Sequence, residues 1–315
     1  MQCWTRLGLG LLLSLSNLCS ATELTASVFV SAGSAWSKPF EQWVEKINAS
    51  ADLTIRLIGP EALPPSEQVQ AFKERRVEII VLPAGNYLTW MPEAAAQDLS
   101  NMTLAEQRAS GGYAALNQLL RKRLNAIALT TYGTGVTYHL YLTEPISSSK
   151  ALQGMRVRTH AMHSPFFQSL GLYAATIDPT NLATALDYNI VQGYGTTLWG
   201  TEQFAWAART VQRVEPGFYN ASVNVLMHYQ TWQALSEAQQ QALTKASYAF
   251  EKNLPAYTAK HNQQARLLQQ QAGIQTLNLG PNFAAHAEQV YWQQLEQKSP
   301  KEIAKLKPLL IKPVP

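Results

Sequence analysis

The chain has 315 residues, of which 46% are hydrophobic, 10% aromatic and only 15% charged, enough apolar material for the cores of about two domains. After the N-terminus no segment reaches the roughly 18 consecutive apolar residues of a membrane span, and Gly and Pro are not enriched. Disorder, a coiled coil and a polytopic membrane protein are therefore excluded. The net charge of +4 is mildly basic and does not by itself indicate a nucleic-acid partner.

The first residues, 1–21, have the pattern of a secretory signal peptide. Arg6 is their only charge, an apolar run follows it, and small residues lead up to Ala21. We expect export to the periplasm with cleavage near Ala21, because the apolar run is too short for an anchor helix that spans a membrane. Both cysteines, Cys3 and Cys19, lie in this segment, so the mature chain is expected to lack disulfides, thiol catalysis and cysteine metal sites.

The N-terminal part of the mature chain alternates strand and helix patterns. Most of its strand patterns are short and apolar, as expected for a parallel sheet covered by helices. The expected strands are 24–31, 53–58, 79–82, 126–130, 136–142, 155–159, 174–177 and 189–191, and the expected helices include 104–124, 164–170 and 180–186. Glycine runs at Gly133–Gly135 and Gly193–Gly195 predict tight turns at strand ends. The pattern predicts two successive α/β units.

The C-terminal third is dominated by one long helix, expected from Ser236 to Gly273. Its Ala, Gln, Leu and Lys content favours helix, and Pro255 in the middle removes a backbone donor and should kink it. A last helix is expected at 282–297, followed by a basic tail from Lys298 that we expect to pack only partly.

Enzyme signatures are missing from the sequence. It has no nucleophile elbow, no zinc-protease His-Glu-x-x-His and no phosphate loop, and we expect no catalytic residue, no cofactor and no metal. His160 and His163 are spaced to share a metal, but exposed polar roles are commoner for such pairs. The basic clusters at 73–76 and 121–123 lie at helix ends, where cations complement the helix dipole, so no nucleic-acid partner is expected.

Arg158 stands out in the expected strand 155–159. Alternation places Met155 and Val157 on one face of the strand and both Arg156 and Arg158 on the other. An arginine at the carboxyl end of a strand either extends to solvent or points into the crevice where open α/β sheets bind ligands. The residues alone leave both possibilities open.

The order of several short motifs resembles the extracytoplasmic solute-binding proteins of tripartite ATP-independent periplasmic (TRAP) transporters, the dicarboxylate-binding-protein family. Each motif is weak alone, but their order and spacing cover nearly the whole mature chain. The motifs are 59–67 before a helix ending in 76–79, Glu144-Pro145-Ile146, 152–159, 167–171, Ala185-Leu186 ahead of 190–193, and 232–236 before the long helix.

This resemblance implies an α/β, two-lobe periplasmic binding protein fold with the long kinked helix bridging the lobes. Lobe I would comprise 22–135 plus about 223–255, and lobe II 136–222 plus about 256–315. It also implies that Arg158 forms a salt bridge to the carboxylate of a small organic acid in the cleft, and that the membrane permease subunits of a TRAP transporter are the partner. A guanidinium suits that role because its rigid fork of donors matches a carboxylate.

The sequence departs from the family elsewhere in the expected pocket. Gln192-Gly193 replaces the usual Asp-Gly pair, Pro179 replaces an aromatic residue that stacks on the ligand, and a second cationic position falls near Tyr138. We therefore expect a monocarboxylate with an apolar or aromatic body. Tyr138 is itself expected to contact the ligand. Further lining residues are expected in loops after strands, at Trp36, Asn86, Tyr87, Tyr194, Thr196 and Trp199.

Two other functions stay open at this point. One is a secreted hydrolase that uses a histidine such as His160 or His228, which would need a nucleophile and an orienting group brought together by the fold. The other keeps the binding fold but serves a sensory partner in place of a permease.

Overall fold

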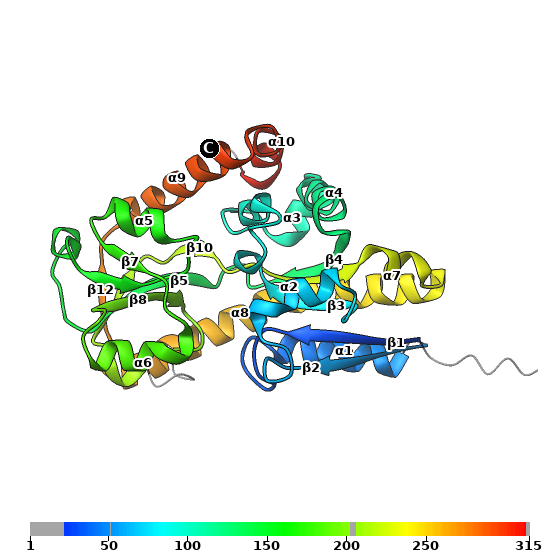
Figure 1. The fold of residues 1–315 in the computed structure, drawn as a ribbon, viewed down its shortest axis with the longest axis horizontal. Helices are drawn as coiled ribbons and strands as arrows, with labels where there is room; N and C mark the ends of the chain where they lie inside the picture. The colour runs from blue at the N-terminus through cyan, green and yellow to red at the C-terminus, as the bar shows by residue number, and fades with distance from the viewer. Residues whose placement is uncertain (1–21, 51, 202–205, 313–315) are drawn as a thin grey trace, which may run out of the picture.

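The computed structural model describes residues 22–50, 52–201 and 206–312. The expected signal peptide lies outside the described residues. Among those described, no helix is long and apolar enough to cross a membrane. Two β-sheets form the cores of two lobes, which lie side by side in Figure 1.

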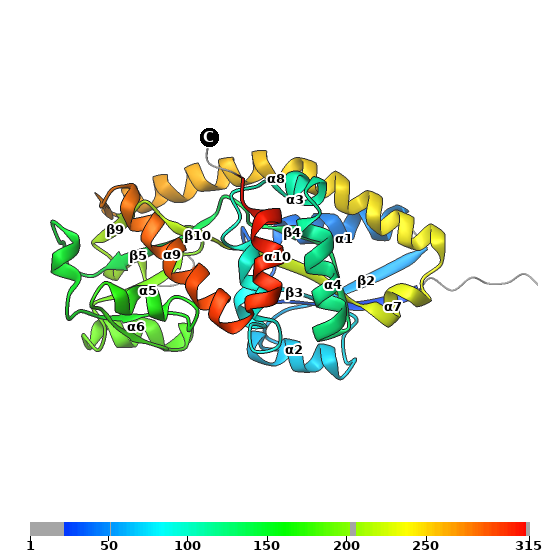
Figure 2. The same ribbon diagram turned by 90° about the horizontal axis from the view of Figure 1, so that it is seen from above.

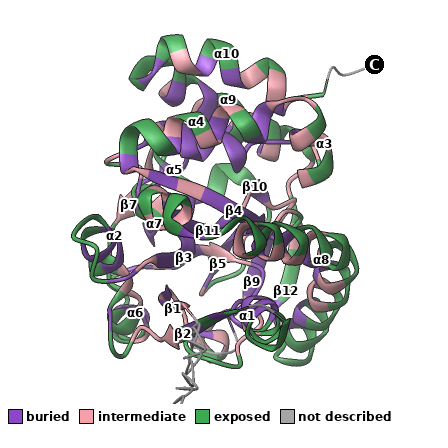
Figure 3. Ribbon diagram, turned by 90° about the vertical axis from the view of Figure 1, so that its right-hand side faces the viewer, coloured by how far each residue is buried: buried purple, intermediate pink, exposed green. Residues whose placement is uncertain are grey.

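Lobe I is built on a five-stranded sheet of order β2-β1-β3-β11-β4, in which β11 runs antiparallel to both of its neighbours. The interior strands are almost wholly buried, and the helices around them expose one face, as Figure 3 shows. The strands are β1 (Thr22–Val28), β2 (Leu53–Ile58), β3 (Ile79–Pro83), β4 (Ala126–Tyr132) and β11 (Val223–His228). The helices are α1 (Lys38–Ser50), α2 (Pro65–Lys73), η1 (Ala84–Asn86), η2 (Pro92–Gln97), α3 (Leu104–Ala109), α4 (Gly112–Leu124) and α7 (Tyr229–Ala234).

Lobe II is built on a sheet of order β12-β9-β5-β8-β6-β7, with β10 paired to β5. Its strands are β5 (Thr137–Leu142), β6 (Arg156–Arg158), β7 (Tyr173–Ala175), β8 (Gly193–Thr197), β9 (Gln212–Glu215), β10 (Phe218–Asn220) and β12 (Gln275–Asn278). Its helices are η3 (Ser149–Leu152), α5 (Ser164–Ser169), α6 (Pro179–Asp187) and η4 (Ala207–Arg209). One face of the sheet packs α6 through a small core around Tyr141 and Tyr194. The other carries Tyr138, which contacts His163 at the start of α5, and Phe218, which contacts Phe166 of α5.

The long helix α8 (Glu237–Gln271) begins with a capping box at Ser236 and contains Pro255. Its first half packs on lobe I, where Phe250 lies against Tyr132. Near its end Gln269 donates to the carbonyl oxygen of Leu198 in lobe II at 2.9 Å. Figure 2 shows the helix passing along both lobes and changing direction in its middle. The expected bridging helix is thereby confirmed.

The C-terminal tail differs from the expectation that it packs only partly and belongs to lobe II. After α9 (Pro281–Lys298), residues 300–310 form α10 (Pro300–Leu310), which contacts η2 and α4 of lobe I. Ile303 and Leu310 are fully buried, and the Ser100 hydroxyl donates to the carbonyl oxygen of Leu310 at 2.6 Å. The apolar residues of the tail recur at helical spacing and form one apolar face that packs on lobe I. The many lysines and prolines of the tail led to the expectation of partial packing.

Two extended segments also connect the lobes, and they touch each other. The backbone N–H of Ala221, which leads into β11, donates to the carbonyl oxygen of Val136, which leads into β5, at 2.9 Å. Gly133 lies beside this contact with φ of 92°, a conformation that glycine adopts without strain. A Cβ there would lie 2.0 Å from the carbonyl oxygen of Ala221. The turn expected at Gly133–Gly135 is therefore present, and it lies at a crossing between the lobes.

Candidate functional site

Arg158 ends strand β6, and its side chain is buried, with only 2% of its surface exposed. Its Nε donates to the carbonyl oxygen of Ile177 at 2.9 Å, and one Nη donates weakly to the carbonyl oxygen of Gly195 at 3.4 Å. The second Nη has no hydrogen-bond partner among the residues that the structure describes. These carbonyl groups fix the position of the guanidinium without neutralising its charge.

No carboxylate of the described chain forms an ion pair with Arg158. Burial lowers the pKa of Arg158, and the charges of Asp178 and Tyr138 act in the opposite direction. Arg213, the other buried arginine of lobe II, is by contrast paired with Glu215 at 3.0 Å. A buried cation without a partner is costly unless an anion completes its surroundings. The arrangement around Arg158 therefore suits the binding of an anion.

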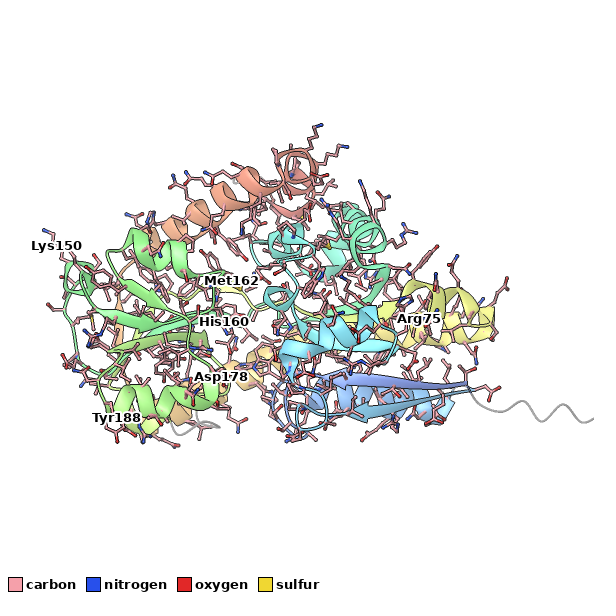
Figure 4. All side chains as sticks on the ribbon, viewed as in Figure 1. Arg75, Lys150, His160, Met162, Asp178 and Tyr188 are labelled. Carbon is pink, nitrogen blue, oxygen red and sulfur yellow. The ribbon has the colours of Figure 1, made fainter. Side chains whose placement is uncertain are left out.

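His160 and Asp178 lie close enough to Arg158 for its charge to lower their pKa, and both lie on the side of lobe II that faces lobe I. Figure 4 shows His160, Met162 and Asp178 along this side. Met162 is in contact with lobe I, because a Cβ on Gly85 would lie 2.9 Å from its Sδ. The loop that follows β6 thus reaches the boundary between the lobes.

The histidines beside Arg158 are held neutral. The His160 ring is accessible to solvent, yet the protein around it and the charge of Arg158 lower its pKa to about 4. His163 is fully buried, its ring lies 4.4 Å from that of Tyr138, and neither ring nitrogen has a hydrogen-bond partner among the described residues. Burial lowers the pKa of His163 well below its usual value. Neither ring supplies a second cation at neutral pH.

The Tyr138 hydroxyl is close enough to a charged group of each lobe to be affected by both. It interacts with Arg158 of lobe II and with Asp98 of lobe I, and burial raises its pKa. Of the predicted lining residues, Tyr138 is therefore the one most directly associated with Arg158. Thr196, on the neighbouring strand β8, is partly buried and opposes His139 in the ladder.

Trp36 and Trp199 come together in a separate cluster beside α8. Their ring centroids are 4.7 Å apart, and both rings are buried. The Trp199 Nε1 donates to Oδ1 of Asn262 in α8 at 2.8 Å. This pair joins the lobes. Among the described residues neither ring contacts Arg158, so the structure shows two groups of residues in place of one aromatic pocket.

Two of the predicted lining residues lie in hydrophobic cores. Tyr194 was expected in a loop, but it belongs to strand β8, stacks on Tyr141 at 5.2 Å and shares a hydrogen bond with Thr210 at 2.6 Å. Tyr87 is 2% exposed and packs inside lobe I. Asn86, next to it, is exposed. The expected strand 189–191 and the turn expected at Gly193–Gly195 were therefore wrong, since β8 comprises Gly193–Thr197.

The histidines considered for a hydrolase lie on different lobes. His160 follows β6 of lobe II, whereas His228 ends β11 of lobe I and contacts Phe72. Within the described ranges, no three His, Cys, Asp or Glu side chains lie together in a way that could hold a metal ion.

The family model and the similar solved structures both indicate a bacterial extracellular solute-binding protein. Residues 27–300 match the family model of the bacterial extracellular solute-binding proteins, family 7. Among solved structures, the chain is similar to a marine metagenome TRAP solute-binding protein specific for pyroglutamate, with a TM-score of 0.78, 15% identity, and coverage of 92% of this chain and 99% of that one.

Two further solved structures have the same fold. A Bordetella pertussis extracytoplasmic solute receptor binding pyroglutamic acid has a TM-score of 0.76 at 14% identity and covers 91% of this chain and 100% of its own. A Desulfovibrio salexigens TRAP periplasmic solute-binding protein with bound orotic acid has a TM-score of 0.78 at 16% identity, with 91% and 96% covered. At these identities the likeness shows the two-lobe fold, as the sequence predicted.

Proposed function

The chain belongs to family 7 of the bacterial extracellular solute-binding proteins, and from this premise we propose that it captures a small organic acid between its lobes for uptake by a TRAP-type transporter. The compartment would be the periplasm, reached through the signal peptide. The partners would be the membrane permease subunits of that transporter. The similar structures are described as holding pyroglutamate or orotate, which are both carboxylates, and this supports an organic acid as the ligand.

The observation that carries the proposal is the buried, unpaired guanidinium of Arg158. Its backbone partners Ile177 and Gly195 orient it, and one Nη stays available for a ligand oxygen. A charge-assisted hydrogen bond to a carboxylate contributes about 1.5 to 3 kcal/mol. Arg158 is therefore the residue that we assign to the ligand carboxylate.

The surroundings of Arg158 favour one carboxylate over two. The second cation implied by the family resemblance would fall near Tyr138, which is not cationic, and His160 is neutral at pH 7 because its pKa is about 4. A second carboxylate would find no matching charge on these side chains and would lose its hydration. We infer that the ligand is a monocarboxylate.

Binding would act on the relative position of the lobes. The lobes are connected through α8, through the crossing segments at Gly133 and Ala221, and through the tail, in which α9 contacts lobe II and α10 contacts lobe I. This is a small set of connections of the kind that permits hinge motion. A ligand that contacts both lobes favours the closed arrangement by its extra contacts there. The closed arrangement would be the one that docks on the permease.

A thermal-shift screen tests this function. Protein freed of co-purified ligand by unfolding and refolding is mixed with aliphatic and aromatic monocarboxylates, C4-dicarboxylates, sugar acids and uncharged analogues. A ligand at 100 times its Kd adds about 2.7 kcal/mol of stability, which raises Tm measurably. Stabilisation by monocarboxylates but not by their amides is expected. Stabilisation by uncharged solutes alone would refute the proposal.

A further inference from the structure

We propose that the ligand carries an N–H donor next to its carboxylate and that Asp178 accepts this donor, so that the ligand class is amino acids and N–H heterocyclic acids. This inference rests on the proposed function and concerns the same site. Asp178 was not among the residues expected to line it.

One carboxylate oxygen of Asp178 accepts hydrogen bonds from the described residues, and the other does not. Asp178 is the N-cap of α6, where Oδ1 accepts from the backbone N–H of Thr180 at 2.9 Å and from its hydroxyl at 2.6 Å. Oδ2 has no partner among the described residues, and the side chain is exposed. The hydrogen bonds from Thr180 lower the pKa of Asp178, so the group is an anion at neutral pH.

The carboxylate of Asp178 stays close to Arg158 without pairing with it. Arg158 donates to the carbonyl oxygen of Ile177, the residue directly before Asp178, and the charge of Arg158 lowers the pKa of Asp178. The two groups do not form an ion pair: the guanidinium donates to backbone carbonyl oxygens, and Oδ1 of Asp178 accepts from Thr180. Figure 4 shows Asp178 on the same side of lobe II as His160. The site thus presents a fixed cation and a fixed anion beside each other.

This pair of charges discriminates between acids. An acid with no donor would place its carboxylate near that of Asp178, and the repulsion would offset part of the attraction to Arg158. An acid with an N–H next to its carboxylate would satisfy Arg158 with the carboxylate and Asp178 with the N–H. Asp178 is exposed in this structure, so the discrimination would arise when the bound acid and lobe I shield its carboxylate from water, where an unpaired oxygen becomes costly.

Two matched pairs of acids test this class by calorimetry at pH 7.5. Pyroglutamate is compared with 5-oxotetrahydrofuran-2-carboxylate, in which a ring oxygen replaces the neutral N–H. Proline is compared with tetrahydrofuran-2-carboxylate, in which the ring oxygen replaces a charged NH2+ group, so this pair differs in charge as well as in the donor. At least a tenfold lower Kd is expected for the N–H member of at least one pair. Equal affinities within both pairs, or binding of none of the four acids, would overturn the inference.

Two variants connect the preference to Asp178. Asp178→Asn keeps a good helix cap but removes the charge, and we expect the preference for the N–H acid to fall to threefold or less. Asp187→Asn, at the other end of α6, where Asp187 pairs with Arg209, makes the same change of charge and should leave the preference intact. A preference that survives in Asp178→Asn would assign the donor site elsewhere.

The two levels of the proposal fail separately. If carboxylates bind through Arg158 without any N–H preference, the solute-binding function stands and only the role of Asp178 is lost. If no carboxylate binds, or if binding is indifferent to Arg158→Ala, the proposed function itself is wrong.

Discussion

The indole rings of Trp36 and Trp199 lie 4.7 Å apart, although Trp36 follows a strand of lobe I and Trp199 follows a strand of lobe II. Tyr257 and His261 of α8 close the same cluster from the third side, at 6.0 and 5.7 Å from Trp199. Both indoles are buried, so the cluster acts as a joint that ties each lobe to the other and to the bridging helix.

Removal of the Trp199 ring should therefore weaken the whole molecule. Trp199→Ala loses the contact with Trp36 and the hydrogen bond to Asn262, and we expect about 3 to 5 kcal/mol less stability in urea unfolding. Trp199→Phe keeps an aromatic ring and should lose clearly less. An alanine variant as stable as the original chain would show that this aromatic cluster does not contribute to the stability of the protein.

The crossing at Gly133 makes a second prediction about the connection between the lobes. Gly133→Ala places a Cβ 2.0 Å from the carbonyl oxygen of Ala221, in addition to the strain of φ at 92°. Gly111→Ala is the matched control, because its φ is 83° but no atom lies within 4 Å of the new Cβ. The control should cost about 1 to 2 kcal/mol, and Gly133→Ala clearly more. Equal losses of stability would mean that the crossing segments separate easily.

Asp98 predicts a pH dependence of stability. Burial raises its pKa to about 7, against the hydrogen bonds from Ser222 that lower it. The unfolded pKa is near 3.8, so the native state binds the extra proton between about pH 4 and pH 7. The contribution of Asp98 to stability is therefore fully present below about pH 4, decreases as the pH rises from 4 to 7, and is lost above pH 7.

Asp98→Asn isolates this contribution. Asn keeps an acceptor for the backbone N–H of Ser222 but cannot ionise, so the stability of the variant relative to the original chain should rise between pH 4 and pH 7 and then stay level. The slope cannot exceed about 1.4 kcal/mol per pH unit. A difference that is constant from pH 4 to pH 8 would show that Asp98 does not titrate there.

Much of this architecture could be predicted from sequence because its signals are local. The apolar strand of Ile79–Pro83 and the capping box at Ser236 each reside in a few neighbouring residues. The glycines of β8 were wrongly interpreted as turn residues, because glycine is required there by close contacts with residues that are distant in the sequence. A Cβ on Gly193 would lie 2.5 Å from the carbonyl oxygen of Tyr141, and one on Gly195 would lie 3.0 Å from the ring of Phe167. Those neighbours are known only once the strands are paired.

In the candidate site, too, the features that depend on neighbouring residues could be predicted, and those that depend on strand pairing could not. The strand position of Arg158 followed from alternation, but its burial without an ion pair did not. Asp178 was missed because its local pattern, Asp before Pro and Thr, describes a helix cap. Its place beside Arg158 depends on the parallel pairing of β6 with β7, where Arg158 opposes Ala175.

Arg158 itself should be dispensable for folding. Its removal takes away a buried charge that no carboxylate of the described chain neutralises, so Arg158→Ala should unfold at the same Tm as the unliganded original chain or slightly above it. Circular dichroism during heating measures this. A large fall in Tm would mean that the bonds to Ile177 and Gly195 hold the lobe together and that Arg158 is structural.

The most direct test of the account is the Kd of a stabilising monocarboxylate for Arg158→Ala and Arg156→Ala, measured by calorimetry. Arg156 lies on the same strand but is exposed and donates to the carbonyl oxygens of Ile190 and Asn189. We predict at least tenfold weaker binding for Arg158→Ala, equal to about 1.4 kcal/mol or more, and less than a twofold change for Arg156→Ala. Unchanged affinity in Arg158→Ala would contradict the central claim that this buried guanidinium binds the ligand carboxylate.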